Sequence, residues 1–200
     1  YAGQVKSSID QMMFSGSLID DPVAPSTTLE SRKITFFQPG DGNYVNGTNY
    51  RQIHMLYHPN GGGLSAKNIP EAIQGGDGTE ADPAPGWYIG RFNNVEWTES
   101  TADDIVLAAY KIEEKVCEQI NVHIKGNTAI PVVSGKLRNF LIKKASTSPA
   151  HLESNTGSHG GSANADLTVT ACADCEGYGS LCVQNDTGDV FAFYSVVAER

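Results

Sequence analysis

The longest run of helical periodicity in the chain lies between residues 100 and 122, STADDIVLAAYKIEEKVCEQINV. Apolar residues recur mostly three and four positions apart, and charged residues from Lys111 to Glu118 fill the other face. Thr101 can cap the first turn, while Asp103 and Asp104 place negative charge where a helix N-terminus favours it. The pattern predicts one long amphipathic helix near 101–122, with its apolar face against a core.

The first fourteen residues, YAGQVKSSIDQMMF, form a second and shorter helical pattern. Their apolar side chains recur at alternating steps of three and four, which places them on one stripe of a helix: Ala2, Val5, Ile9 and Met12. A helix this short is marginal in isolation. We therefore expect it either to continue a longer helix or to dock on the rest of the chain.

Most of the remaining sequence is typical of strands and turns. The chain contains 21 Gly and 9 Pro, which indicates many turns and long loops. Strands are expected at 32–37 and 51–57, within 86–97, at 167–171 and, as a terminal hairpin, at 181–184 and 190–198. The last strand is too apolar for an open edge and should be central or covered. The sequence thus predicts an α+β fold in which an antiparallel sheet packs on the one long helix.

A glycine cluster follows the second expected strand, in His58-Pro59-Asn60-Gly61-Gly62-Gly63. Such density indicates backbone at positive φ or backbone packed closely against another element. Glycine-rich loops can also cradle phosphate, but no Lys-Ser/Thr pair follows this one and no helix start is evident. A packing role is therefore favoured.

The four cysteines of the chain are Cys117, Cys172, Cys175 and Cys182. An even number, with three clustered, favours disulfides formed in an oxidising compartment, and three pairings are possible. The most economical pairs Cys117 with Cys182 and Cys172 with Cys175. The CxxC pair precedes a turn rather than a helix, which argues against redox catalysis. Zinc held by Cys172, Cys175 and Cys182, with Cys117 or a histidine as fourth ligand, stays an alternative.

The charge of the chain argues against nucleic-acid binding, and its lack of known motifs argues against catalysis. The net charge of −9, with no Lys/Arg cluster beyond Lys143-Lys144, disfavours nucleic-acid binding. The histidines lack metal-ligating spacing, and no nucleophile elbow, Walker loop or dinucleotide fingerprint is present. Cys117 lies among glutamates, which disfavour its thiolate. We therefore expect a non-catalytic protein without a cofactor.

The acidic loop at 70–86 contains the one candidate calcium site. Asp77, Glu80 and Asp82 alternate with small residues and could gather around Ca²⁺. The spacing and terminal glutamate of an EF-hand are absent, and runs of charge are usually solvated. A solvated surface loop is the simpler interpretation.

Aromatic residues in the expected strands raise a second possibility. Trp87, Tyr88 and Trp97 could stack on sugar rings, which would make the chain a secreted β-sandwich adhesin or carbohydrate-binding module. Tryptophans in β segments more often belong to the core, because aromatic side chains carry much of the buried area. This function is kept as the alternative.

Four segments, in their order along the chain, carry a family resemblance. They are Leu56-Tyr57-His58-Pro59-Asn60-Gly61-Gly62-Gly63, then Trp87, then Val116-Cys117-Glu118-Gln119-Ile120-Asn121 followed by Ile130-Pro131, and finally CVQNDTGDVFAFYSVVAER from Cys182 to the end. Together they resemble the bacterial type IV pilin-like or pseudopilin family, over the region from Leu56 to Arg200 with long unmatched loops between.

The resemblance implies a structural filament subunit of a pilus or secretion pseudopilus. A short leader and a hydrophobic helix would precede residue 1, be processed by a dedicated peptidase and pack in the filament core. Residues 1–20 would be the outer end of that helix, carrying the stripe described above, and residues 21–200 a globular head with an antiparallel sheet and a C-terminal disulfide.

The resemblance also implies a location and partners. The subunit would be exported, reside in the inner membrane before assembly and end at the cell surface or in an extracellular filament. Its partners would be copies of itself and related pilins, and only the N-terminal helix would contact the membrane.

Overall fold

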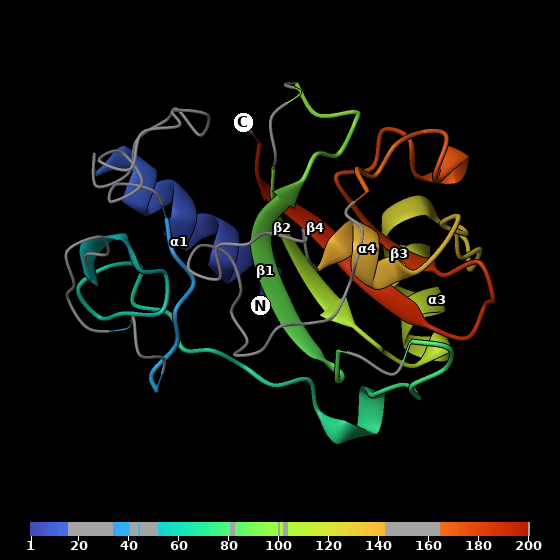
Figure 1. Cartoon of the computed structure of the whole chain (residues 1–200), viewed down its shortest axis with the longest axis horizontal. Helices are drawn as coiled ribbons and strands as arrows, with labels where there is room; N and C mark the ends of the chain where they lie inside the picture. The colour runs from blue at the N-terminus through green and yellow to red at the C-terminus, as the bar shows by residue number, and fades with distance from the viewer. Residues whose placement is uncertain are drawn as a thin grey trace.

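A computed structural model describes residues 1–15, 34–40, 44, 52–80, 83–99, 101, 104–142 and 165–199, with only the backbone of residues 91–93 (Figure 1). In this part of the chain, four strands form one antiparallel sheet in the order β1-β2-β4-β3. Their bounds are Gly86–Asn93, Asp104–Tyr110, Ser180–Gln184 and Phe191–Ala198 for β1 to β4. The labelled helices are α1 (Ala2–Phe14), α3 (Glu114–Lys125) and α4 (Leu137–Leu141). The α+β class is therefore confirmed.

The prediction of one long helix over 101–122 is wrong, because its first half is the central strand β2. All seven β2 residues are buried. Ile105, Leu107 and Ala109 lie on one face of the sheet, while the residues between them pack on the other. A strand covered on both faces reads as a continuous apolar run, which periodicity cannot separate from a buried helix.

The helical half of the predicted segment begins only after a break in the backbone. Lys111 adopts a left-handed conformation, with φ of 56°, directly after β2. The chain then turns, and α3 starts at Glu114 and ends at Lys125, followed by Gly126, whose φ of 77° is the usual left-handed helix cap. The amphipathic helix is thus twelve residues long rather than spanning the whole run.

The strand expectations are confirmed for the terminal hairpin, and within 86–97 for β1 alone. The strand expected at 167–171 is wrong, because Leu167 makes only an isolated bridge to Val95 and residues 169–171 form a turn. Strand β4 lies between β2 and β3, as its apolar sequence requires, and β3 precedes it as the hairpin partner. The segment expected as a strand at 51–57 instead contains a short 3-10 helix, Gln52–His54, with one isolated bridge between Thr35 and Met55. Residues 32 and 33 of the first expected strand lie outside the described residues.

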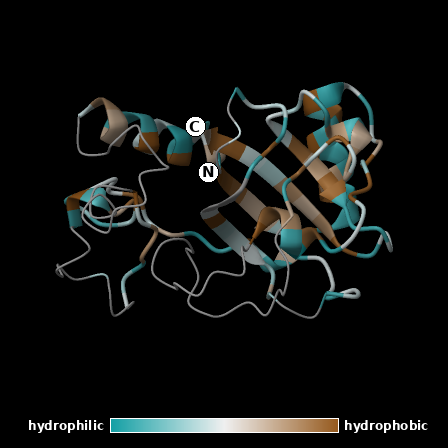
Figure 2. Cartoon of the chain, turned by 45° about the horizontal axis from the view of Figure 1, so that its top comes forward, coloured by the Kyte–Doolittle hydropathy of each residue, from teal (hydrophilic) through white to brown (hydrophobic). Residues whose placement is uncertain are grey.

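The two faces of the sheet carry different elements. Helix α1 and the disulfide-bearing side of α3 pack on the face that includes Leu107 and Cys182. Helix α4 and the segment holding Cys172 and Cys175 pack on the face that includes Tyr194. Figure 2 shows the strands as mainly apolar, whereas α1 and α3 carry both apolar and polar residues. None of the described helices has the length and apolarity that crossing a lipid bilayer requires.

Candidate functional site

The apolar stripe of α1 is buried against the head. Val5 and Ile9 are fully buried and Met12 is 4% exposed, while Ala2 at the start of the helix is half-buried. These side chains join a cluster with residues of β1, β2 and β4, among them Ile89, Ile105, Leu107 and Val197. The opposite side of α1 is exposed and polar at Gln4, Lys6, Ser7, Asp10 and Gln11. The stripe predicted from spacing is therefore the docking face of α1.

The glycine cluster is the second half of this docking surface. A Cβ at Gly61 would lie 2.2 Å from the carbonyl oxygen of Met55, and one at Gly62 would lie 2.5 Å from that of Leu56 and 2.8 Å from Ser8 Oγ. Gly63 has a φ of 66°. Both features expected of the cluster, close packing and positive φ, are confirmed. A side chain at Gly62 would therefore overlap Ser8 of α1, so this position of the loop has to be a glycine for α1 to lie where it does.

Aromatic and polar contacts secure the first turn of α1. The rings of Tyr1 and Trp87 meet edge to face with centroids 5.0 Å apart. The Tyr1 hydroxyl donates a hydrogen bond of 3.2 Å to the Tyr57 hydroxyl, and the ammonium of Lys67 lies over the Tyr1 ring. Burial raises the pKa of Tyr1, although its hydrogen bond to Tyr57 opposes the shift. The helix is thus held at its start by Trp87 and Tyr57 and further along by the glycine loop.

Helix α3 is fastened to the sheet by a disulfide and by one side chain. Cys117 and Cys182 form a disulfide with their Cα atoms 5.4 Å apart, and both residues are fully buried. One turn further along α3, buried Asn121 bonds to both main-chain groups of Cys182: its Nδ2 donates to the carbonyl at 2.8 Å, and its Oδ1 accepts from the amide at 2.9 Å. Asn121 therefore provides β3 with the pair of main-chain hydrogen bonds that a residue of a neighbouring strand would otherwise provide.

The outer edge of β3 at Gln184 is covered by an extended segment. The amide of Val133 donates to the carbonyl of Gln184 at 2.8 Å, and the amide of Gln184 donates to the carbonyl of Pro131 at 2.9 Å. Pro131 has no amide hydrogen to offer a further chain. The edge strand is thus paired by Asn121 and by residues 131–133, which limits its capacity to pair with another sheet.

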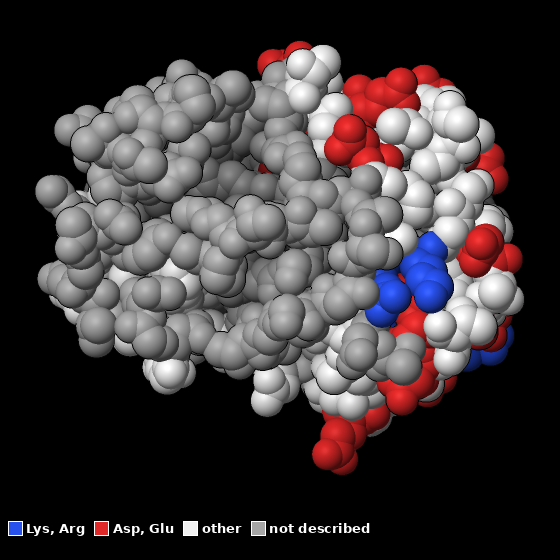
Figure 3. All heavy atoms as spheres, in the orientation of Figure 1, with Lys and Arg blue, Asp and Glu red and all other residues white. Residues whose placement is uncertain are grey.

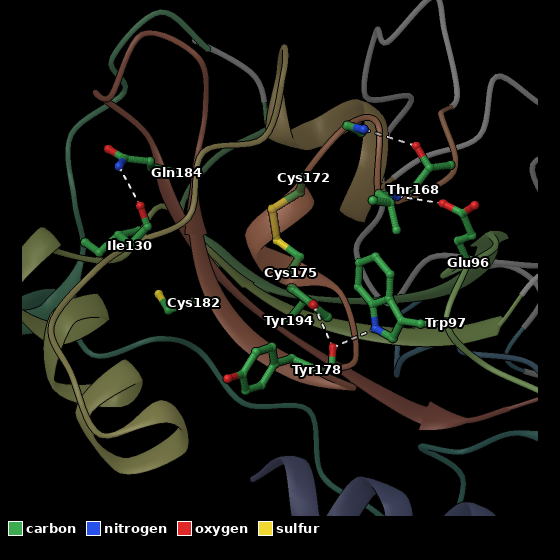
Figure 4. Close-up of a disulfide and its surroundings, with 12 residues drawn as sticks. Glu96, Trp97, Ile130, Thr168, Cys172, Cys175, Tyr178, Cys182, Gln184 and Tyr194 are labelled. Atoms are coloured by element: carbon green, nitrogen blue, oxygen red, sulfur yellow. Dashed lines mark hydrogen bonds between the residues drawn. A yellow bond between two sulfur atoms is a disulfide. The ribbon is translucent and has the colours of Figure 1, made fainter.

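The second disulfide braces a loop on the other face of the sheet. Cys172 and Cys175 are bonded to each other, three residues apart in sequence. In Figure 4, the indole of Trp97 and the hydroxyl of Tyr194 both point to the carbonyl of Tyr178, just beyond this disulfide. The donor to acceptor distances are 2.9 Å from Trp97 Nε1 and 2.7 Å from the Tyr194 hydroxyl. Burial raises the pKa of Tyr194, so its hydroxyl stays a donor.

The cysteine pairing is the economical one among the three possibilities. All four sulfur atoms are engaged in the two disulfides, which leaves no thiolate to hold zinc. Within the described residues, no three His, Cys, Asp or Glu side chains gather as metal ligands would.

The described carboxylates of the calcium candidate point to different partners. Asp77 accepts a hydrogen bond of 2.8 Å from the fully buried ammonium of Lys111. Glu80, 1% exposed, accepts hydrogen bonds from the Tyr110 hydroxyl at 2.6 Å and from the first amides of α4. The two residues therefore tie the 77–80 segment to the end of β2 and the start of α4. Asp82 lies outside the described residues.

The aromatic residues of the carbohydrate alternative do not share a surface. Trp87 packs against Tyr1 on the α1 face of the sheet, whereas Trp97 packs on the opposite face. Tyr88 is 2% exposed and donates its hydroxyl hydrogen to the carbonyl of Ala84. Each side chain has a packing role, and the three form no common platform.

No family model, curated protein or solved structure matches this chain.

The described part of the face seen in Figure 3 is mainly acidic. In Figure 3, red patches of Asp and Glu are more widespread than blue ones over the described atoms of this face. The whole chain has 23 acidic and 14 basic residues. A surface of this sign repels phosphate backbones.

Two residues that matter to this arrangement were not predicted as site residues. Ser8 is buried on the stripe of α1, and its hydroxyl donates to the carbonyl of Gly62. Its position three residues after Val5, on an otherwise apolar face, is a signal that a partner is needed. Asn121 gives the same signal at four residues from Cys117. In both cases the spacing identifies the residue but not its distant partner.

Proposed function

We propose that this chain is a non-catalytic structural subunit of an exported filament, of the type IV pilus or secretion pseudopilus kind. The observation that carries the proposal is the burial of the predicted stripe of α1 on the antiparallel sheet, with the glycine loop of the resembling segment Leu56–Gly63 against it. A subunit of this kind needs a head firmly attached to a helix that assembles. The contacts of α1 meet that requirement.

The attachment is suited to transmitting force between helix and head. Val5, Ile9 and Met12 supply apolar burial, and the Ser8 hydroxyl adds a directional contact to the loop. Burying an aliphatic side chain contributes about 1.5–3 kcal/mol. A helix fixed at several points moves with the head as one body, so that α1 of one copy can position the head on a filament surface.

The disulfides support export rather than catalysis. The Cys117–Cys182 bond joins α3 to β3, and the Cys172–Cys175 bond braces the loop near Trp97. Both are buried, and disulfides persist in oxidising compartments. In this proposal the subunit resides in the inner membrane before assembly and at the cell surface afterwards. Its partners are further copies and related pilins, and a hydrophobic helix ahead of α1 supplies the membrane contact.

Site-specific photo-crosslinking in the producing cells tests the proposal. A photo-crosslinking amino acid replaces Gln4, on the exposed side of α1, in the natural full-length protein. If α1 lies among the helices of a filament, irradiation gives a ladder of multimers of this chain. The same replacement at Gln119, exposed on α3, is the matched control and should give fewer helix-mediated crosslinks.

The upstream coding sequence supplies an independent check. About twenty apolar residues after a short basic leader support the filament subunit. A cleavable signal peptide with a small-residue cleavage site, together with a monomeric secreted product and no crosslinked ladder, would overturn it.

A further inference from the structure

We draw no further inference here: the strongest candidate, the exposed apolar side chains of Val122 and Ile124 near the end of α3 and of Val132 on the segment beside β3, carries none because nothing in the structure shows what covers them.

Discussion

The hydroxyl of Ser8 on α1 donates a hydrogen bond of 2.7 Å to the carbonyl of Gly62 in the loop at 57–63. The two residues are 54 positions apart in sequence, so this contact forms only when α1 is docked. It also places the helix against backbone rather than against a side chain. The absence of a Cβ at Gly62 is therefore a condition of the docked state.

Gly62→Ala should loosen the docking of α1. The new methyl group would overlap the carbonyl of Leu56 and the hydroxyl of Ser8, and one of these has to move. Overpacking of this kind costs about 1–3 kcal/mol. Urea denaturation should show that loss in the free energy of unfolding, and limited proteolysis should cut near α1 sooner.

Gly3→Ala is the matched control for this variant. Gly3 lies on the exposed side of the same helix, and a Cβ there meets nothing within 4 Å. Alanine is favoured over glycine within a helix by about 0.5–1 kcal/mol, so Gly3→Ala should stabilise the protein. Equal stability of Gly62→Ala and the parent chain would show that the close approach at Gly62 is not needed for docking.

The sequence predicted those parts of the fold whose signal is local. The α1 stripe was recognised because a helix docked on one side repeats its apolar residues every three or four positions. Strand β4 was recognised because its long β-branched and aromatic run can be buried only inside a sheet. Each of these elements keeps the same kind of environment along its length, so the spacing of its apolar residues is sufficient to predict it.

The same reasoning failed at residues 104–110 because both faces of β2 are buried. Leu107 faces α1, while Ala108 faces the opposite cluster, so no polar residue marks an exposed side. Acidic residues just before the run imitated a helix start, and Asp104 in fact accepts a hydrogen bond from the amide of Val95. The identity of β2 depends on its neighbours β1 and β4, which local patterns do not contain.

The site residues show the same division. The cysteine pairing could be predicted as the most economical of three possible pairings. The role of Glu80 was not predicted, since its partners lie at Tyr110 and at the start of α4. A buried carboxylate on a turn-rich segment looks identical in sequence to a solvated one. Only the packing of 77–80 against the end of β2 distinguishes the two.

Removing the disulfides one at a time should separate their contributions to stability. The Cys117–Cys182 bond closes a separation of 65 residues and the Cys172–Cys175 bond a separation of 3. The loop-entropy estimate gives about 4 kcal/mol for the first and about 2 kcal/mol for the second. Chemical denaturation of Cys117→Ala/Cys182→Ala and of Cys172→Ala/Cys175→Ala measures both. A larger loss from the second pair than from the first would contradict this ranking.

Asn121→Asp should be strongly destabilising at neutral pH. The amide nitrogen of Asn121 donates to the carbonyls of Ala129 and Cys182, and a carboxylate would face both oxygens without a hydrogen to donate. An unsatisfied buried charged group costs about 3 kcal/mol or more. Lowering the pH protonates the new carboxyl group and returns one donor, so part of the lost free energy of unfolding should be recovered.

Asn127→Asp is the control for this substitution. Asn127 is exposed, and its Oδ1 accepts from the amide of Ala129 at 3.0 Å, a contact that a carboxylate keeps. Its Nδ2 donates a long bond of 3.5 Å to the carbonyl of Lys125, which water can replace at this exposed position. Its stability should match that of the parent chain. If Asn121→Asp also left the free energy of unfolding unchanged, the hydrogen bonds from the Asn121 side chain to the main chain of β3 would not stabilise the fold.

Asp189 should make the protein less stable in acid. Hydrogen bonds from the Thr187 hydroxyl, the Asn185 amide and the Thr79 hydroxyl lower the pKa of Asp189 from its ordinary value of 3.8. The pKa of Asp189 is lower in the folded state than in the unfolded state. Its contribution to the free energy of unfolding is therefore fully present at pH values above the unfolded-state pKa and is lost as the pH falls through the folded-state pKa. Urea denaturation of the parent chain and of Asp189→Asn should therefore differ most near neutral pH and converge in acid.

Asp186→Asn isolates this effect from a general change in net charge. Asp186 lies in the same turn, and its carboxylate accepts no hydrogen bond within the part of the chain that the structure describes. Both variants remove one negative charge, so long-range repulsion changes equally in the two. As the pH falls, the difference in free energy of unfolding between the parent chain and Asp189→Asn should disappear. The free energy of unfolding of Asp186→Asn should stay closer to that of the parent chain over the same pH range. Parallel pH profiles for the two variants would mean that the bonds from Thr187, Asn185 and Thr79 do not stabilise the ionised form.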